Sequence, residues 1–261
     1  MLVGVIHLPA LPGSPRGMLS ASECAKSAAS CARALASGGY DAIIVENFGD
    51  VPFFAGRVPP VTVAAMTACA LAVRDAAPSV SLGINVLRND AEAALSIATC
   101  TGAKFVRVNV LTGARVTDQG IIQGDAAATL RLRRALGAEA IGIWADVDVK
   151  HSAPLGPPRP IAQEVEDTAK RAMAEAVLVT GEGTGKGVDV EKLAAVKRAA
   201  GRTPVLVASG ATIDTLEALA AHATGVIVGS ALRAGGVPGG PIDATLAKTF
   251  ADAFRASFKS A

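Results

Sequence analysis

Aromatic residues and net charge are both scarce in this chain of 261 residues. Phe, Trp and Tyr make up 3% of the sequence, and 25 Lys and Arg against 23 Asp and Glu leave a formal net charge of +2 at pH 7. Proteins that bind nucleic acid use basic surfaces against the phosphates and often stack bases on aromatic rings. The composition therefore predicts that nucleic acid is not a partner of this protein.

Long apolar runs and paired cysteine motifs are also missing. The uncharged stretch 58–73 opens with Pro59 and Pro60 and is too short to span a bilayer, so we expect no membrane span. A signal peptide carries Lys or Arg ahead of its apolar run, which the opening residues MLVGVIHLPALPG do not, so we expect no secretion. The four cysteines form no CxxC pair and are expected to be reduced thiols in a cytoplasmic protein.

Short β-rich segments alternate with longer Ala/Leu-rich segments almost from end to end. Eight segments are predicted strands, namely 3–7, 42–46, 81–85, 105–109, 141–146, 176–180, 205–209 and 225–229. The segments between them carry helix-start signals, such as the capping box from Ser20 to Glu23. Eight strand–helix units in this length predict an α/β protein, a single (β/α)8 TIM barrel over residues 1–261. An open doubly wound sheet is the alternative, although no Pro/Gly/Ser-rich linker divides the chain.

Polar side chains follow the C-terminal ends of nearly all these strands. They are His7, Glu46, Asn85, Arg107, Asn109, Asp146, Asp148, Thr180, Ser209 and Ser230. In a TIM barrel these ends converge on one mouth, where active sites are built. One such residue is equally consistent with a strand that turns into solvent. A whole ring of them near a barrel interior needs partners, which favours a ligand site.

The segment 141–155, IGIWADVDVKHSAPL, carries the most chemistry. Asp146, Asp148 and Lys150 alternate along it and would share one face of a strand, opposite an apolar face. With Glu46 and His7 they form the predicted catalytic set, because carboxylate, amine and imidazole groups can exchange protons with a substrate. A Schiff base on Lys150 ranks lower, since it requires a lowered lysine pKa and flanking carboxylates raise that pKa.

Other polar groups at the mouth are predicted to contact the substrate. They are Asn85, Arg107, Asn109, Asp118, His151 and Thr180. A structural ion pair with Glu46 or Asp146 is the alternative for Arg107, and a turn-stabilising role is the alternative for Asp118. Glu46, Asp146 and Asp148 also offer hard oxygen ligands, so a divalent metal ion (Mg²⁺, Mn²⁺ or Zn²⁺) is a candidate cofactor, although no metal-binding signature supports it.

Two glycine-containing turns follow the seventh and eighth predicted strands. Ser209 and Gly210 end VLVASG, and Gly229 and Ser230 end VIVGS. Glycine lets backbone N–H groups approach an anion, and the loops after strands 7 and 8 are the usual phosphate site of TIM barrels. These four residues are the predicted phosphate-binding residues. Tight turns that simply need glycine are the alternative.

A third glycine-rich loop, 180-TGEGTGKGVD-189, follows the sixth predicted strand. It does not fit GxxxxGK[ST], because Gly187 stands after Lys186, so a P-loop nucleotide site is excluded. The loop is predicted to be a lid or a further phosphate contact with Lys186 supplying charge, and a flexible exposed loop is the alternative.

Seven segments taken together resemble the BtpA/SgcQ family. They are GVIHLPALPGSP (4–15), DAIIVENFGDVPF (41–53), MTACALAVR (66–74), GINVLRND (83–90), FVRVNVLTGARVTDQGIIQG (105–124), ADVDVKHSAPL (145–155) and VTGEGTG (179–185). The resemblance implies a TIM barrel like the ribulose-phosphate-binding barrels. The family is named for a role in photosystem I biogenesis, yet it also resembles products of sugar-metabolism gene clusters in non-photosynthetic bacteria.

Two functions follow as hypotheses. The first is a cytoplasmic enzyme, expected to be a homo-oligomer, that performs acid–base chemistry of an isomerase or lyase kind on a phosphorylated sugar or related small metabolite. The second is a non-catalytic biogenesis or stability factor for photosystem I. The apolar segment 51–61 would be a partner surface under the second hypothesis, and a lid or a subunit contact under the first.

Overall fold

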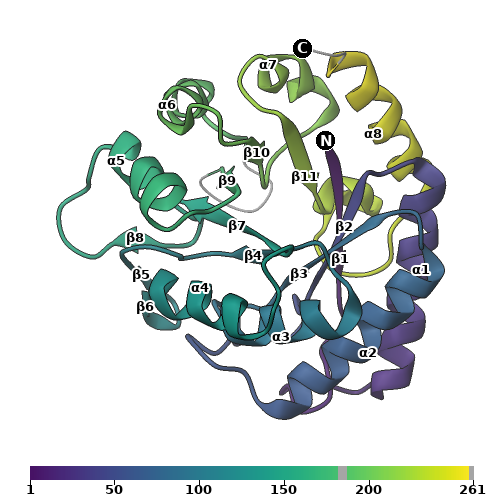
Figure 1. The fold of residues 1–261 in the computed structure, drawn as a ribbon. Helices are drawn as coiled ribbons and strands as arrows, with labels where there is room; N and C mark the ends of the chain where they lie inside the picture. Colours follow the sequence, from purple (N-terminus) through teal and green to yellow (C-terminus); the bar gives the residue numbers. More distant parts are fainter. Residues whose placement is uncertain (182–186, 259–261) are drawn as a thin grey trace.

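Eight parallel strands close into a barrel in the computed structural model, which describes residues 1–181 and 187–258 (Figure 1). The strands are β1 (Leu2–His7), β2 (Ala42–Glu46), β3 (Ser81–Asn85), β4 (Phe105–Val108), β7 (Gly142–Val147), β9 (Ala176–Val179), β10 (Val205–Val207) and β11 (Gly225–Val228). They pair in that order, and β11 closes on β1. The predicted TIM barrel is confirmed, and the open sheet is excluded because all eight strands pair in a closed ring that leaves no edge strand.

Helices surround the barrel between successive strands, as Figure 1 shows. They are α1 (Ala21–Gly38), α2 (Pro60–Ala76), α3 (Ala91–Thr101), α4 (Ala126–Ala135), α5 (Ile161–Glu166), α6 (Val190–Ala200), α7 (Leu216–Ala220) and α8 (Ala244–Ser257). The predicted capping box is present, because the Ser20 side chain accepts from the Glu23 N–H and Glu23 reaches back to the Ser20 N–H. Such capping satisfies the N–H groups that a helix start leaves without partners.

Alternate residues of each strand face opposite sides of the barrel wall, as the period of a strand requires. The inward side chains fill the barrel centre, where Phe105 and Trp144 stack with ring centroids 3.6 Å apart. The outward side chains of β7, such as Ile143 and Val147, pack in the larger core beneath the helices. The apolar face predicted for the segment 141–155 therefore meets the helices.

A small antiparallel sheet beside the barrel was not predicted from the sequence. It consists of β5 (Ala114–Thr117), β6 (Gly120–Gln123) and β8 (Ala153–Pro154), with β5 in the middle. The hairpin of β5 and β6 carries Asp118, one of the residues predicted to contact the substrate, at its turn. Its strands are only four residues long, and β8 pairs with β5 across a wide sequence separation, so local periodicity gives little signal for them.

Gly83 on β3 gives a test of the packing inside the barrel. A Cβ at this position would lie 2.3 Å from the Phe105 ring, and that ring is already stacked on Trp144. We expect Gly83→Ala to lower the free energy of unfolding by about 1–3 kcal/mol, as overpacked cores do. Gly56→Ala is the control, because no atom lies within 4 Å of its Cβ position. Urea melts measure both, and equal values would contradict this packing.

Candidate functional site

The inward row of residues becomes polar at the C-terminal ends of neighbouring strands. His7 on β1 lies in register with Glu46 on β2, and Glu46 lies in register with Asn85 on β3. Asn85 in turn lies in register with Arg107 on β4, and Asp146 ends the inward row of β7. The predicted ring of polar strand ends is therefore a real layer of side chains across the top of the barrel.

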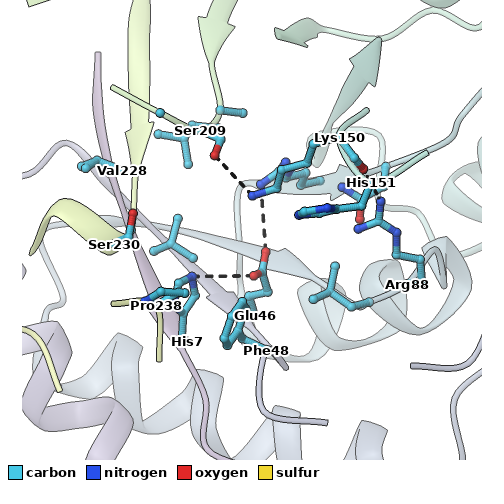
Figure 2. A pocket seen from close by; sticks show the side chains of 18 of the residues that line it. His7, Glu46, Phe48, Arg88, Lys150, His151, Ser209, Val228, Ser230 and Pro238 are labelled. Atoms are coloured by element: carbon cyan, nitrogen blue, oxygen red, sulfur yellow. Dashed lines mark hydrogen bonds and ion pairs between the residues drawn. The ribbon is translucent and has the colours of Figure 1, made fainter. Parts of the chain in front are cut away.

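A cavity of about 260 Å³ lies above this layer (Figure 2). The predicted site residues that line it are His7, Glu46, Arg107, Asn109, Lys150, His151, Ser209, Gly210, Gly229 and Ser230. The apolar part of its wall includes Val51 and Phe53, from the segment 51–61. Part of that segment therefore contributes to the cavity wall, and the lid and subunit-contact alternatives stay predictions. Its neighbour Phe54 remains exposed.

Arg107 and Asp146 form a buried bidentate ion pair in the barrel wall. The Arg107 Nε and Nη2 donate to the two Asp146 oxygens at 3.1 and 3.0 Å, and Asn109 Nδ2 also donates to Asp146. Burial alone would lower the pKa of Arg107, but the charges of Asp146 and Glu46 outweigh it and raise that pKa. Asp146, predicted to be catalytic, does not line the cavity, since it lies beneath it and holds Arg107 in place.

Glu46 and His7 stand side by side at the cavity floor, as Figure 2 shows. The His7 Nε2 lies 3.8 Å from Glu46 Oε1, and the His7 ring stacks on Phe48. Gly239 N–H donates to His7 Nδ1, so the neutral ring carries its proton on Nε2, toward Glu46. Burial lowers the pKa of His7 well below 6.5, and the charges of Arg233, Lys150 and Arg107 lower it further. His7 is therefore a neutral donor at pH 7.

Lys150 reaches the cavity from the loop that follows β7. The Lys150 Nζ lies 3.3 Å from Ser209 Oγ. The backbone N–H of Lys150 donates to Thr180 Oγ1, and its backbone carbonyl oxygen accepts from Arg88 Nη2. Burial lowers the pKa of the Lys150 amine below 10.5, and Arg107 adds to this, while Glu46 and Asp146 oppose it. The flanking carboxylate Asp146 raises this pKa as expected, but desolvation and the neighbouring cations outweigh it, so the net shift of the pKa is downward. The direction of this shift is the one that a Schiff base at Lys150 requires.

Asp148 points away from the cavity, and this differs from the predicted arrangement. The strand β7 ends at Val147, and Asp148 has a φ of +46°, so the alternation of faces stops before it. Its carboxylate pairs with Arg115 of β5 and with Lys192 of α6. Burial raises the pKa of Asp148, but these two cations outweigh it and lower the pKa. Asp148 fastens the loop that carries Lys150 to two neighbouring elements.

The two glycine turns meet on one side of the cavity. Gly210 has a φ of +75°, a conformation that favours glycine, and a Cβ on Gly229 would lie 3.2 Å from the His7 ring. A short helical turn, Ser230–Leu232, begins directly after Gly229, and the first amides of such a turn have no partner within it. Arg233 donates to the carbonyl oxygens of Gly229 and Val5 and fixes the second turn against β1.

Arg88 is a lining residue that sequence reasoning missed. It follows β3 within the segment GINVLRND and is 7% exposed. Its position in a loop rather than at a strand end kept it out of the predicted ring. The signal that could have indicated Arg88 is a charged residue that follows the polar strand end Asn85 closely in a mostly apolar segment.

The remaining predicted contacts fall at different distances from the cavity. His151 lines it and is exposed, whereas Thr180 and Asn85 are buried beneath it. The Asn85 Nδ2 donates to the Arg107 carbonyl oxygen. Asp118 lies exposed at the turn between β5 and β6, where its charge raises the pKa of Arg88 and His151 against the lowering effect of burial. Lys186 lies outside the described residues, so the predicted lid at 180–189 stays a prediction.

The three carboxylates expected to bind a divalent metal ion are not brought together. Glu46 lies near His7 and Arg107, and Asp146 is paired with Arg107. Asp148 is paired with Arg115 and Lys192, away from the cavity. Within residues 1–181 and 187–258, no group of three or more His, Cys, Asp and Glu side chains is placed to hold a metal ion. Glu46 is the one of these three carboxylates that reaches the cavity, so a metal bound here would need ligands from the substrate as well.

Comparison with known proteins identifies the family. The sequence model described as the BtpA family matches residues 1–256. The chain belongs to the BtpA family. A BtpA relative, the photosystem I biogenesis protein BtpA of Synechocystis sp., is 44% identical over 259 residues, which cover 99% of this chain and 89% of that protein. In the described part of the chain, no helix is both long and apolar enough to cross a membrane.

Solved structures similar to this BtpA family member share its fold at low sequence identity. A structure described as native KDPGal has a TM-score of 0.60 and 15% identity, and the match covers 99% of this chain and 94% of the other. Orotidine 5′-phosphate decarboxylase from Pyrococcus horikoshii has a TM-score of 0.58 and 16% identity, with coverage of 98% and 99%. At these identities the likeness establishes the TIM-barrel fold and leaves the chemistry to the site itself.

The lowered pKa of His7 predicts how stability depends on pH. The unfolded chain takes up a proton at His7 near pH 6.5, but the folded chain does so only at lower pH, so folding stability is full above pH 6.5 and falls as the pH drops below it. The slope from this group reaches about 1.4 kcal/mol per pH unit. We expect His7→Gln to flatten the decline between pH 6.5 and 5, measured by urea melts. His222→Gln serves as the control, and the same flattening in it would argue against the assignment.

Proposed function

We propose that this BtpA family member is an enzyme that acts on a phosphorylated sugar or a related small metabolite. The observation that carries the proposal is a single cavity that unites proton-transfer groups with two glycine turns. His7, Glu46 and Lys150 line one part of it, and the turns at Gly210 and Gly229 line another. The cavity is also lined by Arg88, which forms no ion pair with a carboxylate among the described residues and suits an anionic ligand.

The proposed chemistry is proton transfer at a carbon or oxygen of the bound metabolite. The lowered pKa of Lys150 enlarges the fraction of neutral amine, which is the form that accepts a proton, and the Nε2–H of neutral His7 donates to an oxygen on which negative charge develops. Glu46 lies beside His7 and supplies a second base within the same wall. Isomerisation and carbon–carbon cleavage both use such a set, and we place the reaction in one of these classes.

Phosphate recognition is the step that a binding experiment tests first. We expect ribose 5-phosphate and inorganic phosphate to raise the melting temperature and ribose to leave it unchanged, since a ligand of the native state stabilises it by RT ln(1 + [L]/Kd). Ser230→Asp places a carboxylate at the second glycine turn and should weaken phosphate binding at least tenfold. Ser79→Asp, at an exposed position outside the cavity, is the control. Equal stabilisation by ribose and ribose 5-phosphate would count against the proposal.

A second candidate function is a biogenesis factor for photosystem I. The 44% identity to the Synechocystis protein of that name supports it. The two functions differ in what the cavity must do. If the role is non-catalytic, a Lys150→Met variant should restore photosystem I as well as the wild-type chain does in a Synechocystis strain that lacks its own relative. If the role depends on chemistry in the cavity, the variant fails while its melt remains normal.

A further inference from the structure

Two arginines belong to the wall of the cavity, and they differ in their partners. The fork of Arg107, formed by Nε and Nη2, is filled by the two oxygens of the Asp146 carboxylate. Arg88 is as deeply buried as Arg107, with 7% and 6% of their surfaces exposed. Among the described residues, no carboxylate lies within 4.0 Å of the Arg88 guanidinium. The same wall therefore holds one arginine fork that is filled by a carboxylate and one that is not.

The hydrogen bonds of Arg88 account for only part of its donors. Its Nη2 donates to the Lys150 carbonyl oxygen at 2.8 Å, which fixes the side chain in position. Its Nε is buried without a hydrogen-bond partner in the part of the chain that the structure describes. A buried charged group that lacks an acceptor is unfavourable, so a fixed side chain of this kind marks the place of an acceptor supplied by a ligand.

The location of Arg88 separates it from the phosphate turns. Figure 2 shows Arg88 on the opposite side of the cavity from Ser230, with Lys150 and Glu46 between them. A ligand that reaches both sides therefore passes the proton-transfer groups in its middle. Since Arg107 is neutralised by Asp146, the positive charge at this end of the cavity is that of Arg88.

We propose that Arg88 binds a carboxylate of the substrate, so that the substrate is a phosphorylated acid with one anionic group at each end. The phosphate lies at the turns of Gly210 and Gly229, and the carboxylate lies at Arg88. A planar carboxylate matches an arginine fork through two parallel hydrogen bonds, as Asp146 does on Arg107. This inference rests on the proposed function and narrows its substrate class.

Matched pairs of ligands test the carboxylate directly. The acids 3-phosphoglycerate, 4-phosphoerythronate and 6-phosphogluconate are compared with glycerol 3-phosphate, erythritol 4-phosphate and glucitol 6-phosphate, which carry a hydroxymethyl group in place of the carboxylate. Isothermal titration calorimetry on the full chain gives each dissociation constant. We expect the acid of at least one chain length to bind ten or more times more tightly than its alcohol.

Three variants show whether Arg88 causes that preference. Arg88→Met should remove the preference for the acid while the affinity for the matched alcohol changes less than threefold, which also shows that the cavity is intact. Arg88→Lys keeps the charge but loses the fork, so it should keep only part of the preference. Arg131→Met, on the exposed surface of α4, should bind both ligands as the wild type does.

The outcomes separate this inference from the proposed function. If the phosphorylated alcohols bind and the acids bind no better, the proposed function survives and the assignment of Arg88 is overturned. If Arg88→Met keeps the full preference, the assignment is also overturned. If propane-1,3-diol bisphosphate binds more tightly than 3-phosphoglycerate, the second group is a phosphate and the carboxylate is wrong. If neither inorganic phosphate nor any of these ligands binds, the proposed function fails and the inference fails with it.

Discussion

Replacing Asp146 with alanine is expected to lower the free energy of unfolding by about 3–5 kcal/mol, the cost of breaking a buried ion pair by removing one partner. The side chain of Asp146 accepts three hydrogen bonds, two from Arg107 and one from Asn109. Without it, Glu46 at 4.0 Å is the one carboxylate among the described residues that still pairs with the buried guanidinium of Arg107. Equilibrium urea unfolding, with the slope of the transition checked for two-state behaviour, measures the loss.

Two further variants make the result specific to the buried pair. Asp252→Ala breaks the exposed pair with Lys248 on α8 and should cost less than about 1 kcal/mol. The double variant Arg107→Met with Asp146→Leu removes both charges of the pair and should recover part of the stability that Asp146→Ala loses, because the unpaired guanidinium is gone while the buried Glu46 loses its nearby cation. A loss in Asp146→Ala no larger than that in Asp252→Ala would show that the pair is not the structural element described here.

Replacing Lys150 with methionine is expected to reduce turnover by about 10²–10⁴-fold, the range for loss of a general acid or base. Methionine fills a similar volume without the amine, so the melting temperature should stay within a few degrees of the wild type. The substrate for the assay is the phosphorylated metabolite that binds most tightly in the ligand comparison. Lys248→Met, at an exposed position, controls for the loss of a lysine.

The pH dependence of turnover gives a second readout for Lys150. Its lowered pKa enlarges the neutral amine fraction below pH 10.5, so kcat/KM in the wild type should rise with pH, with the midpoint of the rise below pH 10.5. Where the substrate carries a carbonyl group, borohydride reduction followed by mass spectrometry distinguishes an imine on Lys150 from proton transfer alone. Unchanged turnover in Lys150→Met would remove this residue from the chemistry.

The period-two pattern of the strands made most of the barrel and its polar layer predictable. Inward-facing pairs such as Val5 with His7 and Ile44 with Glu46 can be read from the local sequence, because alternate residues of a strand share a face. The prediction failed for Asp148 because β7 ends at Val147, the residue before it. The positive φ of Asp148 then turns its carboxylate toward Arg115 and Lys192. Where a strand ends depends on its neighbours and is not visible in the alternation.

The electrostatics of the site could not be derived from neighbours in the sequence. Asp146 and Asp148 are close to Lys150 along the chain, yet burial and Arg107 dominate its pKa. Arg107 comes from another strand and Arg88 from the loop after β3, so their effect on Lys150 arises only when the barrel closes. The pairing of Arg107 with Asp146 was one of two sequence-based alternatives, and the structure selects it over a substrate contact through the same fork.

A crystal structure of the chain soaked with saturating inorganic phosphate tests the central proposal most directly, because the position of the anion does not depend on knowing the substrate. The proposal predicts phosphate in the cavity, within hydrogen-bond distance of backbone or side-chain donors at Gly210, Gly229 and Ser230. Phosphate bound only at sites outside this cavity would contradict it.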